Sequence, residues 1–297
     1  MAENRVSVLI TCDIDPTPEA SLGEKRGALQ RTLELFDKYN IKSTFFYVAS
    51  VAKDYTSQIE AQLAGGHEIG CHGLNHDEYE EYNRLEGSVQ RDLLTRATAI
   101  LRELSGKEIK SFRGPRVKTS NITHGILESL GYSADSSVCS QRIDFVSSNL
   151  INLKWITAPR LPYNPSISSA FKRGKRRIVV VPVSAIVVPF LSGALYTFGL
   201  GFMKTFFRLL YIESKKSGKP VVYILHPAEF ARRTERRKER YSLRVEGFRF
   251  RRSEFFFEQD EERRYELNDR LMEFISSYPD VEFITVNDFV LKFKGES

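Results

Sequence analysis

Short apolar runs alternate along the chain with longer amphipathic stretches. The runs that predict β-strands cover residues 6–11, 44–49, 67–71, 111–113, 132–135, 178–184, 221–225 and 283–286. Between them, residues 24–39, 85–104 and 261–277 place apolar side chains at spacings of three and four, which predicts helices. This alternation predicts an α/β fold with a largely parallel sheet. Chain length and strand number favour a barrel over two domains, although periodicity alone also fits a doubly wound sheet.

Three segments depart from this rhythm and are predicted to be excursions from one domain of residues 1–297. Residues 137–177 are polar and interrupted by prolines, residues 189–212 are unusually apolar, and residues 229–258 are rich in arginine and phenylalanine. Connections this long decorate a compact domain more often than they form its core.

The apolar excursion permits two interpretations. Prolines and glycines interrupt it and its surroundings, whereas a membrane-spanning helix needs about 20 mostly apolar residues in a row, so we predict no such helix. Core packing or a subunit interface explains its composition most simply. The alternative is an apolar rim that accepts a polyisoprenyl chain or makes peripheral contact with a membrane.

The charge of the chain is concentrated in one place. The 297 residues carry 44 Lys+Arg and 38 Asp+Glu, a net charge of +6, yet residues 232–252 alone carry ten basic and three acidic side chains. Such a segment is often simply a solvated surface. As a binding surface it would suit an anionic glycan, a sugar diphosphate or a lipid-linked sugar phosphate. No nucleic-acid-binding motif accompanies it, so we expect no nucleic-acid partner.

The cysteines bear on the compartment rather than on the chemistry. Cys12, Cys71 and Cys139 are few, distant and odd in number, so they predict no disulfide framework. Together with the lack of a signal-peptide pattern at residues 1–11, this predicts a reducing, cytoplasmic location. We expect the three thiols to be buried packing residues and not metal ligands.

Two pairs of polar residues suggest a metal site. His72 and His76 are four residues apart, a spacing that on a helical turn lets two imidazoles bind one ion. Asp13 and Asp15 follow the first predicted strand, where α/β barrels place active-site groups. They could instead form a turn, cap a helix, or act as the Asp-x-Asp of a glycosyltransferase. That motif needs no histidine pair, so a site of two histidines and one aspartate with open positions is favoured.

Three further polar residues occupy equivalent positions. Arg113, Asp135 and His226 each fall at the carboxyl end of a predicted strand. Each alone has a structural explanation, as a surface ion pair, a turn aspartate or a buried histidine. Because the carboxyl ends of parallel strands meet at one edge, their joint occurrence there favours an active site.

In chain order, these segments resemble the motifs of one known family. Residues 11–15 are similar to the first motif of polysaccharide deacetylases of the NodB-homology type, carbohydrate esterase family 4, and residues 72–76 to its metal-binding histidine motif. The other similar segments are residues 113–116, 132–137 and 225–227, which resemble the Arg-x-Pro-Tyr motif, the fourth motif and the leucine–histidine motif, and residues 281–289, which resemble the closing strand. The resemblance implies a distorted (β/α) barrel.

The resemblance also implies a divalent metal ion, zinc in most such enzymes, with cobalt or another ion as the alternative. Its ligands would be Asp15, His72 and His76. An ion held by two neutral imidazoles and one carboxylate keeps positive charge, polarises a carbonyl and can lower the pKa of its water toward about 7.

Four residues would carry the remaining catalytic roles that the resemblance implies. Asp13 would be the general base and His226 the general acid. Arg113 would orient Asp13, and Asp135 would tune His226. The base removes a proton from the attacking water, and the acid protonates the leaving amine.

Departures from the family pattern concern the substrate. Gly73 stands where many members have Ser or Thr, a form found in allantoinase-like branches, and Arg116 replaces the motif's tyrosine. Arg116 could still supply a backbone N–H to an oxyanion, and its charge would suit a carboxylate or phosphate. The only tryptophan, Trp155, is distant from the fourth motif, which leaves the acyl pocket undefined.

From these observations we expect a hydrolase that removes an N-acyl, most simply N-acetyl, group from an amino sugar. The carbohydrate substrate could be anionic or lipid-linked. One alternative is an allantoinase-like hydrolase of a non-sugar amide. The other is a catalytically silent barrel that binds anionic glycans.

Overall fold

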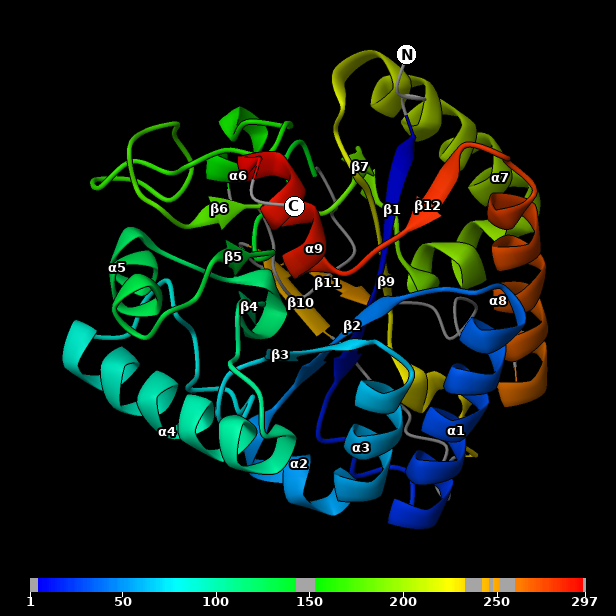
Figure 1. Cartoon of the computed structure of the whole chain (residues 1–297), viewed down its shortest axis with the longest axis horizontal. Coiled ribbons are helices and arrows are strands. Elements are labelled where there is room, and N and C mark those ends of the chain that lie inside the picture. Colours follow the sequence, from blue (N-terminus) through cyan, green and yellow to red (C-terminus); the bar gives the residue numbers. More distant parts are fainter. Residues whose placement is uncertain (1–4, 143–152, 233–241, 246–247, 252–259, 296–297) are drawn as a thin grey trace.

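The computed structural model describes residues 5–142, 153–232, 242–245, 248–251 and 260–295 (Figure 1). Its β-strands are β1 (Val6–Ile14), β2 (Ser43–Tyr47), β3 (Glu68–Cys71), β4 (Ser111–Phe112), β5 (Ala134–Asp135), β6 (Val179–Val180), β7 (Ala185–Ile186), β8 (Val188–Pro189), β9 (Val221–Leu225), β10 (Ser242–Val245), β11 (Phe248–Arg251) and β12 (Val281–Phe283). Its α-helices are α1 (Leu22–Lys38), α2 (Ala49–Ala52), α3 (Thr56–Ala64), α4 (Gly87–Ser105), α5 (Asn121–Ser129), α6 (Leu153–Thr157), α7 (Ser192–Ser217), α8 (Glu261–Ser276) and α9 (Val286–Lys294), and short 3₁₀ turns cover Lys53–Tyr55, Pro115–Val117 and Pro227–Phe230.

The main sheet is parallel and curls into a distorted, open barrel with helices around it (Figure 1). Its order is β12-β1-β2-β3-β4-β5-β6, and β9 pairs with the other side of β1. β6 and β9 do not pair; near that opening, Leu191 forms an isolated parallel bridge to Ile224 of β9. The predicted barrel class is confirmed.

Strand β1 is the centre of this arrangement. All nine of its residues are buried, as expected of a parallel strand covered on both faces. Its first three residues pair with β12, residues Val8 to Cys12 pair with β9, and Ile10 to Ile14 pair with β2. The carboxyl end of β1 therefore lies inside the barrel mouth, between strands that end at the same edge.

The helices that periodicity predicted are present, with boundaries set by local capping. The Ser21 hydroxyl accepts the N–H of Glu24 at the start of α1, and Asp260 accepts the N–H of Arg263 at the start of α8. Helix α4 ends at Gly106, whose φ of 62° is left-handed and favours glycine. The apolar faces of these helices pack against the sheet.

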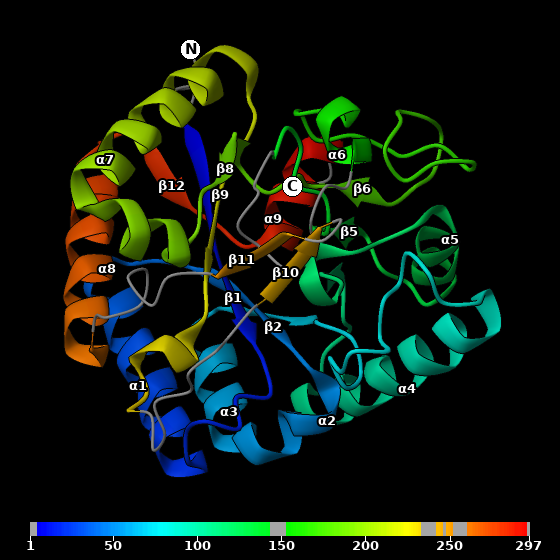
Figure 2. The same cartoon turned by 180° about the vertical axis from the view of Figure 1, so that it is seen from behind.

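The segment predicted as an apolar excursion is instead mostly helical. Helix α7 packs against β9 and lies beside α8 (Figures 1 and 2). Its buried face includes Leu195, Phe206 and Phe207, so core packing accounts for much of its apolar character. Its outer face still exposes Phe198, Phe202, Leu209 and Ile212. Among helices of the described residues, none is both long enough and apolar enough to cross a bilayer.

Several strands are shorter than predicted, and local sequence explains where two of them end. β6 covers only Val179–Val180 of the run 178–184, because Pro182 has no N–H to donate to a neighbouring strand. The closing strand stops at Phe283, because the Thr285 hydroxyl accepts the N–H of Asp288 and starts α9.

The other two excursions are described in part. Within residues 137–177, the structure describes α6 and the loop that pairs with β6 through Tyr163 and Val180. Within residues 229–258 it describes residues 229–232, which include the end of the Pro227–Phe230 turn, and the antiparallel strands β10 and β11. Most of the basic segment 232–252 lies outside the described residues, so its predicted role stays a prediction.

Candidate metal centre and active site

The carboxyl edge of the barrel gathers the polar residues singled out in the sequence. Asp15 directly follows β1, His72 follows β3, Arg113 follows β4 and His226 follows β9. Asp13 was predicted to follow the first strand, but it lies within β1, where it pairs with Phe46 of β2. The strand extends further than expected because Cys12 and Ile14 bury their side chains on the other face.

Asp15, His72 and His76 form a candidate metal site. Asp15 Oδ1 lies 3.4 Å from His72 Nε2 and 3.7 Å from His76 Nε2. This Oδ1 atom is buried and accepts no hydrogen bond from any residue that the structure describes. Two ligand atoms about 2.1 Å from a tetrahedral zinc ion lie about 3.4 Å apart, so the separations fit such an ion. A buried oxygen without a donor is costly, and a cation would satisfy it.

The hydrogen bonding of His72 supports the same assignment. Its Nδ1 lies 2.6 Å from the backbone carbonyl oxygen of Arg113, which can only accept a hydrogen bond. Nδ1 therefore donates to this carbonyl, and Nε2 is the ring nitrogen that faces Asp15 and is placed to bind an ion. A hydrogen bond of this kind fixes the tautomer and ring orientation of metal-binding histidines.

The two histidines are not on a helical turn, as their spacing predicted. Residues 72–76 form an irregular loop after β3. Gly73 has a φ of 83° and His76 a φ of 57°, so two residues of the loop adopt a left-handed backbone conformation. These left-handed residues bring the second imidazole back toward the first, and the ring centroids are 5.1 Å apart.

Arg113 and Asp13 form a buried ion pair beside this cluster. Arg113 is fully buried, and its Nη1 donates to Asp13 Oδ1 at 2.7 Å and to the Thr11 hydroxyl at 2.9 Å. Its other donors reach the carbonyl and hydroxyl oxygens of Ser136. Burial acts to raise the pKa of Asp13, but Arg113, His72 and His226 outweigh it and lower that pKa. Asp13 is therefore a carboxylate at neutral pH.

His226 faces Asp15 on one side and Glu229 on the other. Its Nε2 lies 4.0 Å from Asp15 Oδ2, and its Nδ1 lies 3.7 Å from Glu229 Oε1. Burial acts to lower the pKa of His226, but Glu229, Asp15 and Asp13 raise it overall. Glu229 is itself held by the Tyr196 hydroxyl, which donates to it at 3.0 Å.

Asp135, which was predicted to tune His226, has other hydrogen-bond partners in the structure. Asp135 lies on β5 and its Oδ2 is 2.6 Å from Nε2 of His124 on α5. Its other oxygen accepts the N–H and hydroxyl of Ser137, and the Ser137 hydroxyl in turn accepts the N–H of Gly114. Both carboxylate oxygens of Asp135 are therefore already engaged in hydrogen bonds within the fold. Asp135 supports the loop that carries Arg113.

Arg116 adopts a left-handed conformation, with a φ of 54°. Its guanidinium donates to the carbonyl oxygen of Asp77 at 2.5 Å, so this side chain packs on the loop that follows His76. The expected contribution of its charge or its N–H to substrate binding stays a prediction.

Three residues near the site were missed in the sequence: Glu80, His124 and Glu229. Glu80 and Glu229 follow His76 and His226 by four and three residues, so a search for acidic residues close to each motif would have found them. His124 has no such signal, because it reaches Asp135 only through the packing of α5.

The cysteines behave as expected. Cys12, Cys71 and Cys139 are buried and unpaired with one another. Burial raises the pKa of Cys71 to about 12, so this thiol stays protonated. In the part of the chain that the structure describes, the cluster able to hold a metal is Asp15, His72 and His76, without a cysteine.

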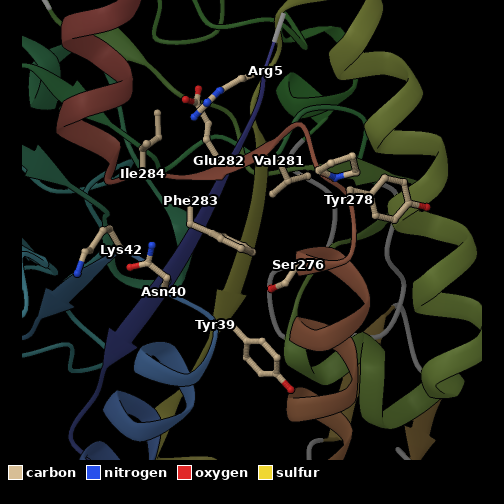
Figure 3. A pocket seen from close by; sticks show the side chains of 11 residues that line it. Arg5, Tyr39, Asn40, Lys42, Ser276, Tyr278, Val281, Glu282, Phe283 and Ile284 are labelled. Carbon is tan, nitrogen blue, oxygen red and sulfur yellow. The ribbon is translucent and has the colours of Figure 1, made fainter. Parts of the chain in front are cut away.

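The opposite, amino-terminal edge of the barrel has a pocket of about 480 Å³ (Figure 3). Its lining includes Arg5, Lys42 and Glu282, and it contains none of the predicted catalytic residues. The candidate metal site therefore lies away from this pocket.

Part of the chain matches a known protein family. The polysaccharide deacetylase family model matches residues 2–134. Over 110 residues, 37% of this chain, the sequence is 28% identical to a peptidoglycan deacetylase of Helicobacter pylori, and that match covers 36% of the relative's length. The chain thus aligns with little more than a third of that protein.

Two solved structures share the fold across nearly the whole chain. A probable polysaccharide deacetylase from Pseudomonas aeruginosa superimposes with a TM-score of 0.64 at 16% identity, covering 99% of this chain and 92% of that one. An allantoinase superimposes with a TM-score of 0.62 at 17% identity, with the same coverage.

Residues 2–134 thus resemble polysaccharide deacetylases in sequence, and nearly the whole chain shares the fold of the two solved structures. The resemblance seen in the sequence motifs is thereby confirmed, and with it the distorted barrel.

Proposed function

We propose that this protein is a metal-dependent hydrolase that removes an N-acyl group, most simply N-acetyl, from an amino sugar in a glycan or glycolipid. The observation that carries the proposal is the placement of the buried Asp13–Arg113 pair beside the Asp15, His72 and His76 cluster. A base and a candidate metal site thus share one edge of the barrel, with His226 also present.

The chain's own residues supply the proton transfers. Asp13, kept ionised by Arg113, accepts a proton from the attacking water. His226, whose raised pKa favours its protonated form, donates a proton to the departing amine. Glu229, rather than Asp135, is the carboxylate beside its other nitrogen. A divalent ion, zinc by the chemistry of the ligands, would polarise the acyl carbonyl and make water more acidic.

A second candidate is the hydrolysis of a non-sugar amide, as in an allantoinase-like reaction. The same residues would serve it, because both reactions break a C–N bond beside a carbonyl. Gly73 in the histidine motif and the shared fold with an allantoinase favour keeping this candidate. If no metal ion binds, the remaining candidate is a catalytically silent barrel that binds anionic glycans.

The substrate class, the partners and the location belong to the same proposal. We expect a carbohydrate substrate, anionic or lipid-linked, and no nucleic acid. The exposed Phe198, Phe202, Leu209 and Ile212 on the outer face of α7 favour peripheral contact with a lipid or membrane. We also expect a cytoplasmic location, because the three cysteines predict no disulfide framework and residues 1–11 show no signal-peptide pattern.

A deacylation screen with metal analysis tests the proposal. Protein loaded with zinc or cobalt would be assayed for amine release from chitooligosaccharides, UDP-amino sugars and lipid-linked saccharides, with cyclic ureides scored separately. We expect about one divalent ion per chain and amine release from an N-acetylated saccharide. Turnover of cyclic ureides alone would favour the second candidate. Absence of stoichiometric metal would exclude both enzymatic functions.

A further inference from the structure

The loop that carries both candidate histidine ligands has little regular structure of its own. The His72 N–H donates to the Tyr47 carbonyl at 2.7 Å, which continues the pairing of β3 with β2. The carbonyl oxygens of Gly73 and Leu74 accept the N–H groups of Ala49 and Ser50, at the start of α2. These bonds leave the three N–H groups of residues 74–76 without backbone partners, although buried amides are nearly always satisfied.

One buried carboxylate satisfies all three of these N–H groups. Glu80 Oε1 accepts the N–H of Leu74 at 2.7 Å, and Oε2 accepts those of Asn75 at 2.6 Å and His76 at 2.7 Å. The Tyr82 hydroxyl also donates to Oε1, at 2.6 Å. Glu80 is 2% exposed, so these charge-assisted bonds are shielded from water.

Gly73 gives Glu80 the space that it needs. A β-carbon on residue 73 would lie 2.6 Å from Glu80 Oε1 and 3.0 Å from the Cγ of Pro115. The φ of 83° at this residue also disfavours any side chain. A serine or threonine at position 73 would therefore displace the carboxylate. The glycine and the glutamate depend on each other.

We propose that Glu80 is a positioning residue for the metal centre, which holds the 72–76 loop so that both imidazoles face Asp15 before an ion binds. Gly73 is required because it makes room for this carboxylate. The inference rests on the proposed metal site, and it assigns a role to a residue that has no contact with ion or substrate. Groups that orient metal ligands in this way typically change metal affinity about 10–100-fold when mutated.

The test compares Glu80→Gln with Glu78→Gln. Glutamine has nearly the same shape but only one acceptor oxygen, so its NH₂ group would face at least one of the loop N–H groups. Glu78 is exposed and nearby, so Glu78→Gln repeats the change in charge without touching the loop. The first measurement is amide hydrogen exchange of residues 74–76 in metal-free protein. The second is Zn²⁺ affinity, by competition with a chelator.

We expect loop amides of Glu80→Gln to exchange about tenfold faster or more, and Zn²⁺ affinity to fall about 10–100-fold. Glu78→Gln should match the wild type in both. Gly73→Ala, which keeps Glu80, should show the same two changes and serves if Glu80→Gln does not fold. The inference would be overturned if amide exchange of residues 74–76 and Zn²⁺ affinity stayed within twofold of the wild type in both Glu80→Gln and Gly73→Ala.

A failure of the proposed function can be distinguished from a failure of the role proposed for Glu80. Wild-type protein that binds Zn²⁺ but deacylates nothing would remove the function and leave the Glu80 result standing. Wild-type protein that binds no divalent ion would remove both the function and the metal-related role of Glu80. The exchange data on metal-free protein would then show only whether Glu80 orders the loop.

Discussion

Two carboxylates at opposite edges of the same sheet have contrasting surroundings. Glu68, at the amino end of β3, accepts hydrogen bonds from the hydroxyls of Ser111 at 2.5 Å and Thr44 at 2.7 Å, and from the N–H of Asn287 at 3.0 Å. Asp15, just beyond the carboxyl end of β1, leaves Oδ1 buried without a donor among the described residues. The first carboxylate is complete within the fold, and the second is not.

The contrast distinguishes a buried carboxylate that stabilises the barrel, Glu68, from one that is placed to bind a metal ion, Asp15. Glu68 links β2, β4 and the start of α9, so it joins elements far apart in the sequence. Asp15 faces the Nε2 atoms of His72 and His76, which are the other two candidate ligands of the metal ion. An unpaired buried acceptor costs about 1–3 kcal/mol. Asp15 is therefore less favourable to the metal-free fold than Glu68, as expected for a group in a binding site.

The largest expected effect is on metal binding. Asp15→Ala should leave no stoichiometric divalent ion after dialysis, because it removes one of three ligands. In metal-free protein, the same change should not lower the free energy of unfolding by more than about 0.5 kcal/mol, since it removes an unsatisfied acceptor. Metal analysis and urea denaturation measure the two effects. A large loss of stability would show that Asp15 is structural, like Glu68.

The next effect concerns catalysis without metal loss. Asp13→Asn keeps the shape of the side chain but removes the base, so kcat should fall about 10²–10⁴-fold. Metal content should stay stoichiometric, because Asp13 is not among the three clustered ligands. Steady-state deacylation kinetics and metal analysis on the same sample check this. A fully active variant would exclude Asp13 as the base.

At the amino edge, removing a buried carboxylate should lower the stability of the protein without changing its metal affinity. Glu68→Ala leaves two hydroxyls and one N–H without their acceptor, so we expect a loss of about 2–3 kcal/mol in unfolding free energy. Zn²⁺ affinity should stay within twofold of the wild type. Glu60→Ala, an exposed position on α3, is the control for removing a glutamate. A changed metal affinity would contradict the separation of the two edges.

The smallest expected effect per unit of change is a pH dependence from the amino edge, of at most about 1.4 kcal/mol per pH unit. Burial, followed by the charge of Lys42, lowers the pKa of His67 from 6.5 to about 4. Between these values the unfolded chain binds a proton that the folded protein does not, so the free energy of unfolding should fall as the pH decreases from about 6.5 to about 4. Urea denaturation at several pH values measures the slope.

His67→Asn should make this slope shallower. The asparagine oxygen can replace Nδ1 as acceptor for the Ser43 N–H, which His67 accepts at 3.1 Å, but it does not titrate. An unchanged slope would assign the acid sensitivity to other groups, including the histidines of the carboxyl edge.

Much of the fold was predictable because the strongest signals are local. The helices expected over residues 24–39, 85–104 and 261–277 are α1, α4 and α8, each within about two residues, because one apolar face per helix packs on the sheet. Helix α7 was missed, because apolar residues on its outer face obscure the periodicity of its buried face. The end of the closing strand was also missed, since a single capping threonine decides it.

The candidate site was predictable to the extent that its residues lie in short motifs. The spacing of His72 and His76 and their order after Asp15 are visible in the chain, and the structure brings the three together. The partners of Asp135 and His226 were not visible. His124 reaches Asp135 through the packing of α5, and Glu229 reaches His226 through a 3₁₀ turn after β9.

The strand–helix order, the barrel class and the candidate ligands were predictable from local patterns, because periodicity and short motifs depend on neighbouring residues. Which buried polar groups are satisfied became visible in the folded structure. Glu68 finds its donors at Ser111 and Asn287, and Glu80 fits only because Gly73 lacks a side chain. The donors that complete Glu68 and the space that admits Glu80 exist only after folding, so the sequence alone could not distinguish these carboxylates from Asp15.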